Sequence, residues 1–210
     1  MNAVFGYTWN THDQNRTVAY TITAPVHAGT GTVNQQALSS TDSREYNVNL
    51  EAGYDFYAMD WTLTPYGRFD YAKTEIDGYS EHMSNPTANG SGLAVAMDSQ
   101  NSTSVTATVG GRVSRTIETH WGYLYPQAGI EYVHEFDNNN KDITGHFVDD
   151  STRTVFRLPT DKPDRNYGDV TAGLTADFRN GWTGHVVYQG LIGYRNLMVH
   201  AFEVGMRLDF

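Results

Sequence analysis

Two pairs of residues in this sequence have types that could perform catalysis or bind a metal. Ser91 and Ser114 lie in no Gly-x-Ser-x-Gly motif and have no His at a spacing that indicates an activated nucleophile. His134 and Glu135 begin like a zinc-binding helix motif, but the second His is missing. They also lie in a strand-like pattern, where neighbouring side chains point to opposite faces. We therefore predict no catalytic residue and no metal site here.

Two further stretches resemble ligand-binding loops only in part. Residues 137–142 read Asp-Asn-Asn-Asn-Lys-Asp, which suggests calcium ligands, but the required Gly and distal Glu are missing. A solvated hairpin loop is the preferred interpretation. Gly29-Thr30-Gly31 precedes no helical pattern, so it does not indicate a phosphate site. With no cysteine for disulfides or thiol chemistry, the sequence predicts a protein without cofactor, metal or enzymatic activity.

The charge balance argues against nucleic acid as a partner. Twenty-four acidic and fourteen basic side chains give a formal net charge of −10, whereas nucleic-acid binding requires clustered Lys and Arg. No run of eighteen apolar residues occurs, which excludes a transmembrane helix from the sequence. The first residues also lack the basic flank and apolar stretch of a signal peptide.

Alternation of apolar and polar residues recurs along the whole chain and is clearest in residues 201–210. Similar patterns occupy 44–57, 60–73 and 168–179, and weaker ones occupy about 3–22, 100–118, 121–136 and 182–193. In the last strand one face carries only apolar side chains: Phe202, Val204, Met206, Leu208 and Phe210. The sequence therefore predicts eight antiparallel strands that are longer than those of most soluble proteins.

The predicted connections alternate in length. Short ones lie at 57–60, 118–120 and 180–181, and long polar ones lie at about 25–42, 77–99 and 137–164; only the connection near 194–196 breaks the rule. Tight turns on one side and long loops on the other are typical of an outer-membrane β-barrel. We expect the long loops to face outside and both chain ends to face the periplasm.

Aromatic residues provide an independent argument for a barrel in lipid, because such barrels place aromatic rings at the membrane interfaces. Trp61, Trp121 and Trp182 each follow a short turn, and Phe56, Phe178 and Phe210 each close a predicted strand. Trp121 is out of phase with its strand, and we expect a bulge to correct it. A soluble β-sandwich or lipocalin-like barrel would instead bury the apolar face and expose the charged one.

Charged residues on the polar faces of these strands are the candidate site. They admit two interpretations: cross-strand pairing that stabilises a polar interior, or the lining of a hydrated pore. The predicted inward residues are Glu51, Asp55, Arg68, Asp70, Arg112, Glu131, Glu135, Asp169, Asp177, Glu203, Arg207 and Asp209.

In their order and spacing, several stretches resemble the β-domain of type V secretion autotransporters over nearly the whole chain. They are GYDF at 53–56, WTLTPYGRFDY at 61–71, IDGY at 76–79, YPQAGIEYVHEF at 125–136, PDRNY at 163–167 and the final MRLDF. The resemblance implies a bacterial outer-membrane β-barrel that anchors and helps translocate an N-terminal passenger. It also implies that the last strand, ending at Phe210, is the signal read by the barrel assembly machinery.

The family's barrel has twelve strands around a helical linker, whereas eight strands and no linker or passenger are visible here. We therefore expect residues 1–210 to be one barrel domain equivalent to the C-terminal two-thirds of that barrel, either as a fragment or as a naturally short relative. The resemblance implies outer-membrane lipid and lipopolysaccharide, the assembly machinery, and the protein's own passenger and linker helix as partners. The inward charges would then contact the linker or the passing passenger.

Two other functions remain open from the sequence. A small stand-alone barrel could act as an adhesin or structural protein through its long extracellular loops. A small outer-membrane lipid-modifying enzyme would need a polar triad at the outer rim, and no such triad can be identified. The residues that precede Met1 would distinguish these functions, because a passenger and four more strands would support translocation.

Overall fold

The computed structural model describes residues 1–22, 31–137 and 142–209. Antiparallel strands make up most of this part of the chain, and its one helical element is a single 3-10 turn, η1 (Ser91–Leu93). None of the described residues belongs to a helix long and apolar enough to cross a membrane. The predicted all-β fold is confirmed.

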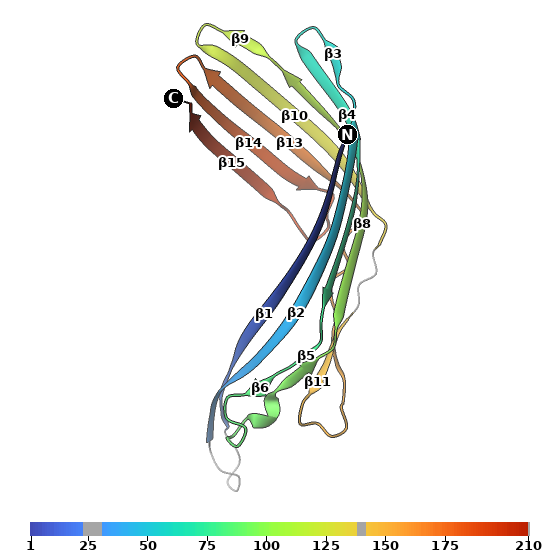
Figure 1. Cartoon of the computed structure of the whole chain (residues 1–210), viewed down its shortest axis with the longest axis vertical. Coiled ribbons are helices and arrows are strands. Elements are labelled where there is room, and N and C mark those ends of the chain that lie inside the picture. The colour runs from blue at the N-terminus through green and yellow to red at the C-terminus, as the bar shows by residue number, and fades with distance from the viewer. Residues whose placement is uncertain (23–30, 138–141, 210) are drawn as a thin grey trace.

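Eight long strands form one curved sheet, as predicted, and each pairs antiparallel with the next long strand along the chain (Figure 1). β1 and β15 are the two ends of this order, and no pairing joins them among the described residues. The eight strands are β1 (Asn2–Ile22), β2 (Gly31–Gly53), β4 (Trp61–Ile76), β8 (Gln100–Arg115), β10 (Gly122–Glu135), β13 (Asn166–Phe178), β14 (Trp182–Ile192) and β15 (His200–Leu208).

The short turns and both ends of the chain lie at one end of the sheet (Figure 1). Asn2 pairs with Glu51, and Leu208 pairs with Trp182, so both terminal strands end beside short turns. The small strands β3 (Phe56–Ala58) and β9 (Ile117–Thr119) extend the sheet at this end by pairing with β4 and β10. This arrangement agrees with the predicted alternation of short and long connections.

Pro65 explains why the predicted strand at 44–57 is divided into β2 and β3. The register of β2 with β4 continues unchanged into β3, and the Tyr54 amide donates to the Pro65 carbonyl at 3.1 Å. Proline has no N–H to return this bond, so one rung of the ladder is missing. Phe56 consequently opens β3 rather than closing a strand.

The bulge expected beside Trp121 is absent, because the register of β10 with β13 runs without interruption from Gly122 to His134. Trp121 lies in the two-residue turn before β10, where strand alternation does not fix the direction of its side chain. Its ring packs 5.0 Å from that of Phe178, measured between centroids.

The predicted long loops contain more structure than expected. β2 begins at Gly31, so residues 31–42 are strand, and only 25–30 of that predicted loop lie outside the described residues. The other two loops contribute a second, four-stranded sheet in the order β12-β11-β7-β5, and β6 pairs with β2. These short strands are β5 (Tyr79–Ser80), β6 (His82–Met83), β7 (Val95–Met97), β11 (Ile143–Phe147) and β12 (Phe156–Leu158). The possible calcium loop at 137–142 falls mostly outside the described residues.

Residues 77–97, here called the cover segment, pack onto the inner face of the far end of the β1–β2 hairpin. Met83 and Ala94 of this segment join a small apolar core with side chains of the hairpin, chiefly Val33 and Ala37, which are 2% and 1% exposed. Gln35 binds the cover segment by accepting from the Asn85 amide at 3.2 Å and donating to the Asn89 carbonyl at 2.7 Å. Gln35 is buried although it is polar, and residues 31–42 contain few apolar residues. For this reason their sequence resembles that of a loop.

An ion pair fixes the cover segment to β1. The Arg16 guanidinium donates to both oxygens of Glu81, at 2.8 and 2.5 Å, and to the Leu93 carbonyl at 2.9 Å. Glu81 also accepts a bond from the Val95 amide at 2.9 Å, and its side chain is 6% exposed. Burial raises the pKa of Glu81, but the bonds from Arg16 and Val95 lower it by more, so the net pKa lies below the usual value of 4.5.

Acid should therefore loosen the cover segment. A carboxyl whose folded pKa is depressed stabilises the fold above its unfolded pKa, and this contribution is lost as the pH falls through the folded value. We expect hydrogen exchange at the Val95 amide to accelerate as the pH falls below 4.5, after correction for intrinsic exchange. Glu81→Gln should remove this extra acid dependence, whereas Glu118→Gln, at an exposed carboxyl near the opposite end of the sheet, should keep it. An unchanged profile in Glu81→Gln would contradict the assignment.

Candidate functional site

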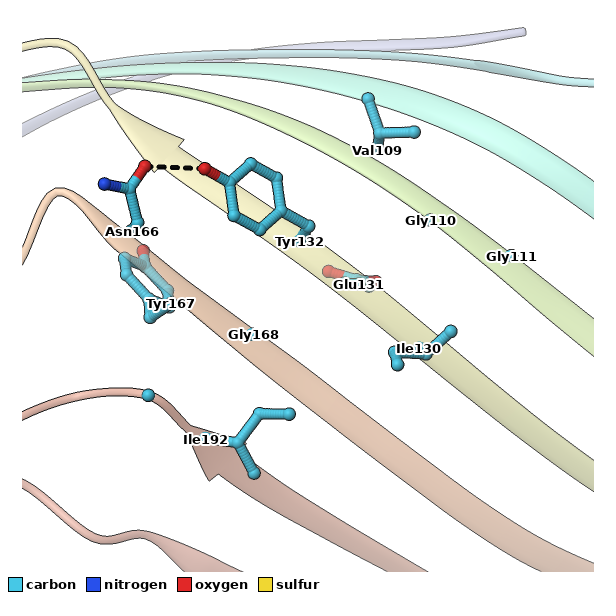
Figure 2. A pocket seen from close by; sticks show the side chains of 11 residues that line it. Val109, Gly110, Gly111, Ile130, Glu131, Tyr132, Asn166, Tyr167, Gly168 and Ile192 are labelled. Carbon is cyan, nitrogen blue, oxygen red and sulfur yellow. Dashed lines mark hydrogen bonds between the residues drawn. The ribbon is translucent and has the colours of Figure 1, made fainter.

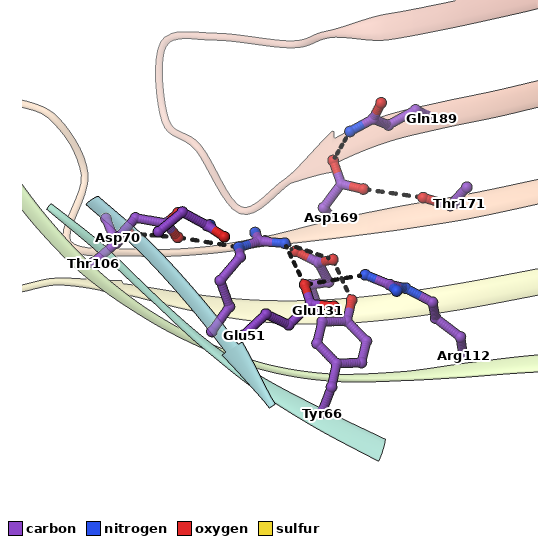
Figure 3. Close-up of polar contacts among 11 residues, drawn as sticks. Glu51, Tyr66, Asp70, Thr106, Arg112, Glu131, Asp169, Thr171 and Gln189 are labelled. Atoms are coloured by element: carbon purple, nitrogen blue, oxygen red, sulfur yellow. Dashed lines mark hydrogen bonds and ion pairs between the residues drawn. The ribbon is translucent and has the colours of Figure 1, made fainter. Parts of the chain in front are cut away.

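The centre of the candidate site is a group of charged side chains on the inner, polar face of the sheet (Figure 3). Glu51 on β2 lies opposite Arg68 on β4, and Arg68 lies opposite Thr108 on β8. Glu131 stands on β10, beyond β8, opposite Gly110. Two strand spacings amount to roughly 10 Å, so Arg68 and Glu131 can meet only by reaching across β8.

Small residues on β8 allow this long reach. Thr108 is 2% exposed beneath the charged groups, and Gly110 has no side chain at the point where the Tyr66 ring crosses the strand. A Cβ added at Gly110 would lie 2.7 Å from the Tyr66 ring, so any other residue would have to displace that ring. Glycine in a strand interior commonly marks such a close approach.

Two arginines and three acids form the network. Arg68 donates to Glu131 at 2.9 Å and to Asp70 at 3.0 Å, and its guanidinium lies 4.0 Å from Glu51. Arg112 lies 3.6 Å from Glu51 and stacks on the Tyr66 ring, 4.1 Å from the ring centroid. The side chains are between 18% and 51% exposed, so the charges are paired but remain partly accessible to water.

Hydrogen bonds hold both ends of the Arg68 network in place. The Tyr66 hydroxyl donates to Glu131, and the Asn49 amide donates to Asp70. These bonds restrict the orientations of the Asp70 and Glu131 carboxylates, to which Arg68 donates. The network is therefore a fixed polar surface rather than a set of mobile charges.

A hollow of about 520 Å³ lies over this network on the inner face. Asp169 on β13 lines its far side and accepts bonds from Gln189 at 3.0 Å and Thr171 at 3.3 Å. The Thr108 hydroxyl, which also lines the hollow, has no hydrogen-bond partner among the described residues. This arrangement can hold a polar or charged chain segment, or water, against the sheet.

Strand alternation and register place the predicted inward residues on the polar face, and the structure joins five of them, Glu51, Arg68, Asp70, Arg112 and Glu131, in one network. The others are held separately. Glu135 is buried and accepts from Ser104 Oγ at 2.6 Å and the Val105 amide at 2.9 Å; Asp55 accepts from Thr64 at 2.6 Å; Asp177 accepts from Thr183 at 3.3 Å; Glu203 pairs with His185 at 3.2 Å; and Arg207 pairs with Asp209 at 2.6 Å.

Sequence reasoning missed the uncharged members of the site. Alternation already assigns Tyr66 and Asn49 to the polar faces of their strands, but it gives no indication of their partners. The Gly110-Gly111 pair within a strand was the available indication of a close approach.

The opposite face of the sheet is apolar and exposed. The last strand shows it most clearly, because Phe202, Val204 and Met206 are 74%, 76% and 74% exposed, and Leu208 is 40% exposed. Phe210 lies outside the described residues. A soluble sandwich or lipocalin-like barrel would bury this face, whereas lipid would cover it.

Two comparisons with curated proteins cover only part of the matched proteins. The chain is 24% identical over 173 residues to Lipase 1 of Photorhabdus luminescens, covering 82% of this chain and 25% of that protein. It is 30% identical over 112 residues to an uncharacterized protein in the trpE-trpG intergenic region of Pseudomonas putida, covering 51% of this chain and 17% of that protein. The chain thus spans about a quarter or less of the length of these relatives.

The family comparison covers most of the chain. The Autotransporter beta-domain family matches residues 1–189, a range that includes the seven long strands before β15 except for the last residues of β14. The family implies the bacterial outer membrane and a passenger domain, and its β-domain is not itself an enzyme. Eight long antiparallel strands, a charged inner face and an exposed apolar outer face agree with this match, and the chain belongs to the autotransporter β-domain family of outer-membrane translocator domains.

Proposed function

We propose that residues 1–210 act as a single membrane-embedded domain that anchors an N-terminal passenger in the outer membrane and helps it to cross. The observation that carries this function is the separation of the sheet into an apolar outer face and a charged inner face. Lipid, including lipopolysaccharide, covers the outer face. The inner network and its hollow contact the linker helix or the passing passenger.

The lining role extends beyond the five-residue network. Asp55, Glu135, Asp169, Asp177, Glu203 and Arg207 have the parity of the polar face, so they line the same lumen, Asp169 beside the network and the others at other heights. Their hydrogen bonds and ion pairs hold these charged groups in place along the lumen. No catalytic residue is assigned to this part of the protein, and any activity like that of a lipase would belong to the passenger.

A surface-exposure experiment tests the proposed function. In the complete natural protein, an epitope placed ahead of residue 1 in the passenger should be labelled by antibody on intact cells. Removing residues 182–208, which form β14 and β15, should abolish the label while leaving the epitope detectable in lysates. Labelling that is independent of these strands would contradict a translocator role and favour the stand-alone adhesin.

The last strand also has a proposed role in assembly. Phe202, Val204, Met206, Leu208 and Phe210 present one apolar row to the barrel assembly machinery, as the family resemblance implies. This row lies at the end of the sheet, where β15 pairs only with β14 among the described residues. A free strand edge offers backbone groups for pairing with another protein during assembly.

Phe210→Ala should therefore reduce assembly more than stability. Even the full transfer free energy of a Phe side chain, about 1.5–3 kcal/mol, is a loss that a long barrel can survive. We expect a strong fall in membrane-inserted protein in cells, while the variant refolded in detergent keeps its β-sheet circular dichroism and resists heat nearly as well. Val186→Ala, on the outer face of β14, serves as the control, and equal insertion of both variants would exclude the signal role.

A further inference from the structure

The hollow over the charged network carries an excess of negative charge. The guanidinium of Arg68 is the one cationic group in its lining, which also contains four carboxylates, those of Glu51, Asp70, Glu131 and Asp169. The lining residues come from β2, β4, β8, β10, β13 and β14, so neither end strand, β1 or β15, contributes. The composition of the hollow therefore does not depend on what pairs with the two open edges of the sheet.

Two of these carboxylates lie directly opposite each other. Glu131 on β10 pairs with Asp169 on β13 in the register of the two strands. In Figure 2, which views the apolar face, Ile130 and Tyr132 project from β10, whereas Glu131 between them lies largely behind the ribbon. Like charges that are directly opposite on one face of an antiparallel pair destabilise it. A cation bound between the two carboxylates would remove this repulsion.

Asp169 has free capacity for such a cation. Arg68 pairs with the other three carboxylates of the lining, but Asp169 has no cationic partner among the described residues. Its oxygens accept only from neutral groups, Gln189 Nε2 at 3.0 Å and Thr171 Oγ1 at 3.3 Å. An ionised carboxylate offers roughly four acceptor positions, so about two remain for a ligand.

A buried hydroxyl is a second, independent indication of a ligand. Thr108 lies opposite the inward-facing Arg68 and is 2% exposed, and its Oγ1 has no hydrogen-bond partner within the described part of the chain. Buried polar side-chain atoms usually have a partner. The lysine ammonium and the arginine guanidinium carry several N–H donors and no acceptor, so either can bind the hydroxyl oxygen and the carboxylates together.

We propose that the hollow binds a Lys or Arg side chain of the protein's own segment in the lumen, whose N–H groups donate to Asp169, Glu131 and the Thr108 hydroxyl. The proposal rests on the proposed function, because a segment of the same protein enters the lumen only if this domain is a translocator. It adds a chemical preference to that function: a basic side chain is held at this height of the lumen, and an acidic one is repelled.

Photocrosslinking in the complete natural protein tests this site. A benzophenone amino acid takes the place of Leu191, which lines the hollow directly opposite Asp169. After intact cells are irradiated, mass spectrometry identifies the peptide joined to position 191. We expect a segment that precedes residue 1, with a Lys or Arg next to the joined residue. Asp169→Asn should lower the yield of this product roughly tenfold, because a charge-assisted bond is lost, and the charge-retaining Asp169→Glu should restore most of it.

Replacing the identified basic residue by Gln gives a variant on the other side of the contact. It should lower the yield as much as Asp169→Asn does, and the double variant should lose little more, because both changes remove one interaction. A joined segment without Lys or Arg, an unchanged yield in Asp169→Asn, or fully additive losses overturns the site. Surface display of the passenger epitope is measured in the same cells. Display without the crosslink refutes this site alone, whereas absence of display by the natural protein refutes the proposed function as well.

Discussion

Leu174→Arg should lower the free energy of unfolding of the protein in phospholipid vesicles by about 2–4 kcal/mol. Leu174 lies on the outer face of β13, paired with Pro126 and Val186, and is 38% exposed. In lipid a guanidinium at this position must give up its hydration or distort the bilayer to reach water. The cost arises from the membrane and would be absent if this face met water.

Thr175→Arg is the matched control, because Thr175 is the next residue of the same strand and belongs to the polar face. An arginine there enters the hydrated interior and should cost much less. Both variants are compared with the natural protein by reversible denaturant unfolding in vesicles. If the two variants lose equal free energy of unfolding, the assignment of the Leu174 face to lipid and of the Thr175 face to the interior is wrong.

Arg68→Met should destabilise the protein by about 2–3 kcal/mol, because Glu51, Asp70 and Glu131 would lose the cation that they share. Removing one partner of a fully buried pair costs more, but the Arg68 side chain is 25% exposed and water compensates part of the loss. Methionine keeps the length of the side chain, so the change reports mainly on charge and hydrogen bonding.

Two further variants isolate the charge effect. Arg68→Met combined with Glu131→Gln should recover part of the lost stability, since the double variant leaves one less carboxylate without a partner. Arg179→Met should cost less than about 1 kcal/mol, because its contact with Glu118 is 3.9 Å long and both side chains are more than 60% exposed. Arg68→Met, Glu131→Gln and the double variant form a double-mutant cycle. If the two changes in the free energy of unfolding simply add, these residues do not interact.

Part of the site was predictable from the sequence because strand geometry is regular. The parity of Arg68, Asp70 and Glu131 follows from a side-chain period of two, so their common face could be assigned without coordinates. The contact between Arg68 and Glu131 could not be predicted, because it depends on the register of three strands and on the small size of Gly110 and Thr108 in β8.

The predicted loops were partly wrong because burial there does not follow apolar composition. Gln35, Ser39 and Thr41 are 5%, 8% and 7% exposed on β2, yet their polar side chains gave no apolar alternation to identify a strand. They are buried because the cover segment folds back over the hairpin. This segment begins at Asp77, 36 residues after Thr41, and the Asp77 carbonyl accepts a hydrogen bond from the Thr41 hydroxyl. No local pattern encodes such a contact.

The sequence by itself determined the number of long strands, their antiparallel order, and the apolar and polar faces of each, as in the row from Phe202 to Leu208. These features are local, because alternation and turn length act within a strand and its nearest connection. Tertiary structure alone decided the Arg68 network across β8 and the ion pair between Arg16 and Glu81. The first depends on side chains that come within reach only when three strands adopt one register, and the second requires the cover segment to fold back onto β1.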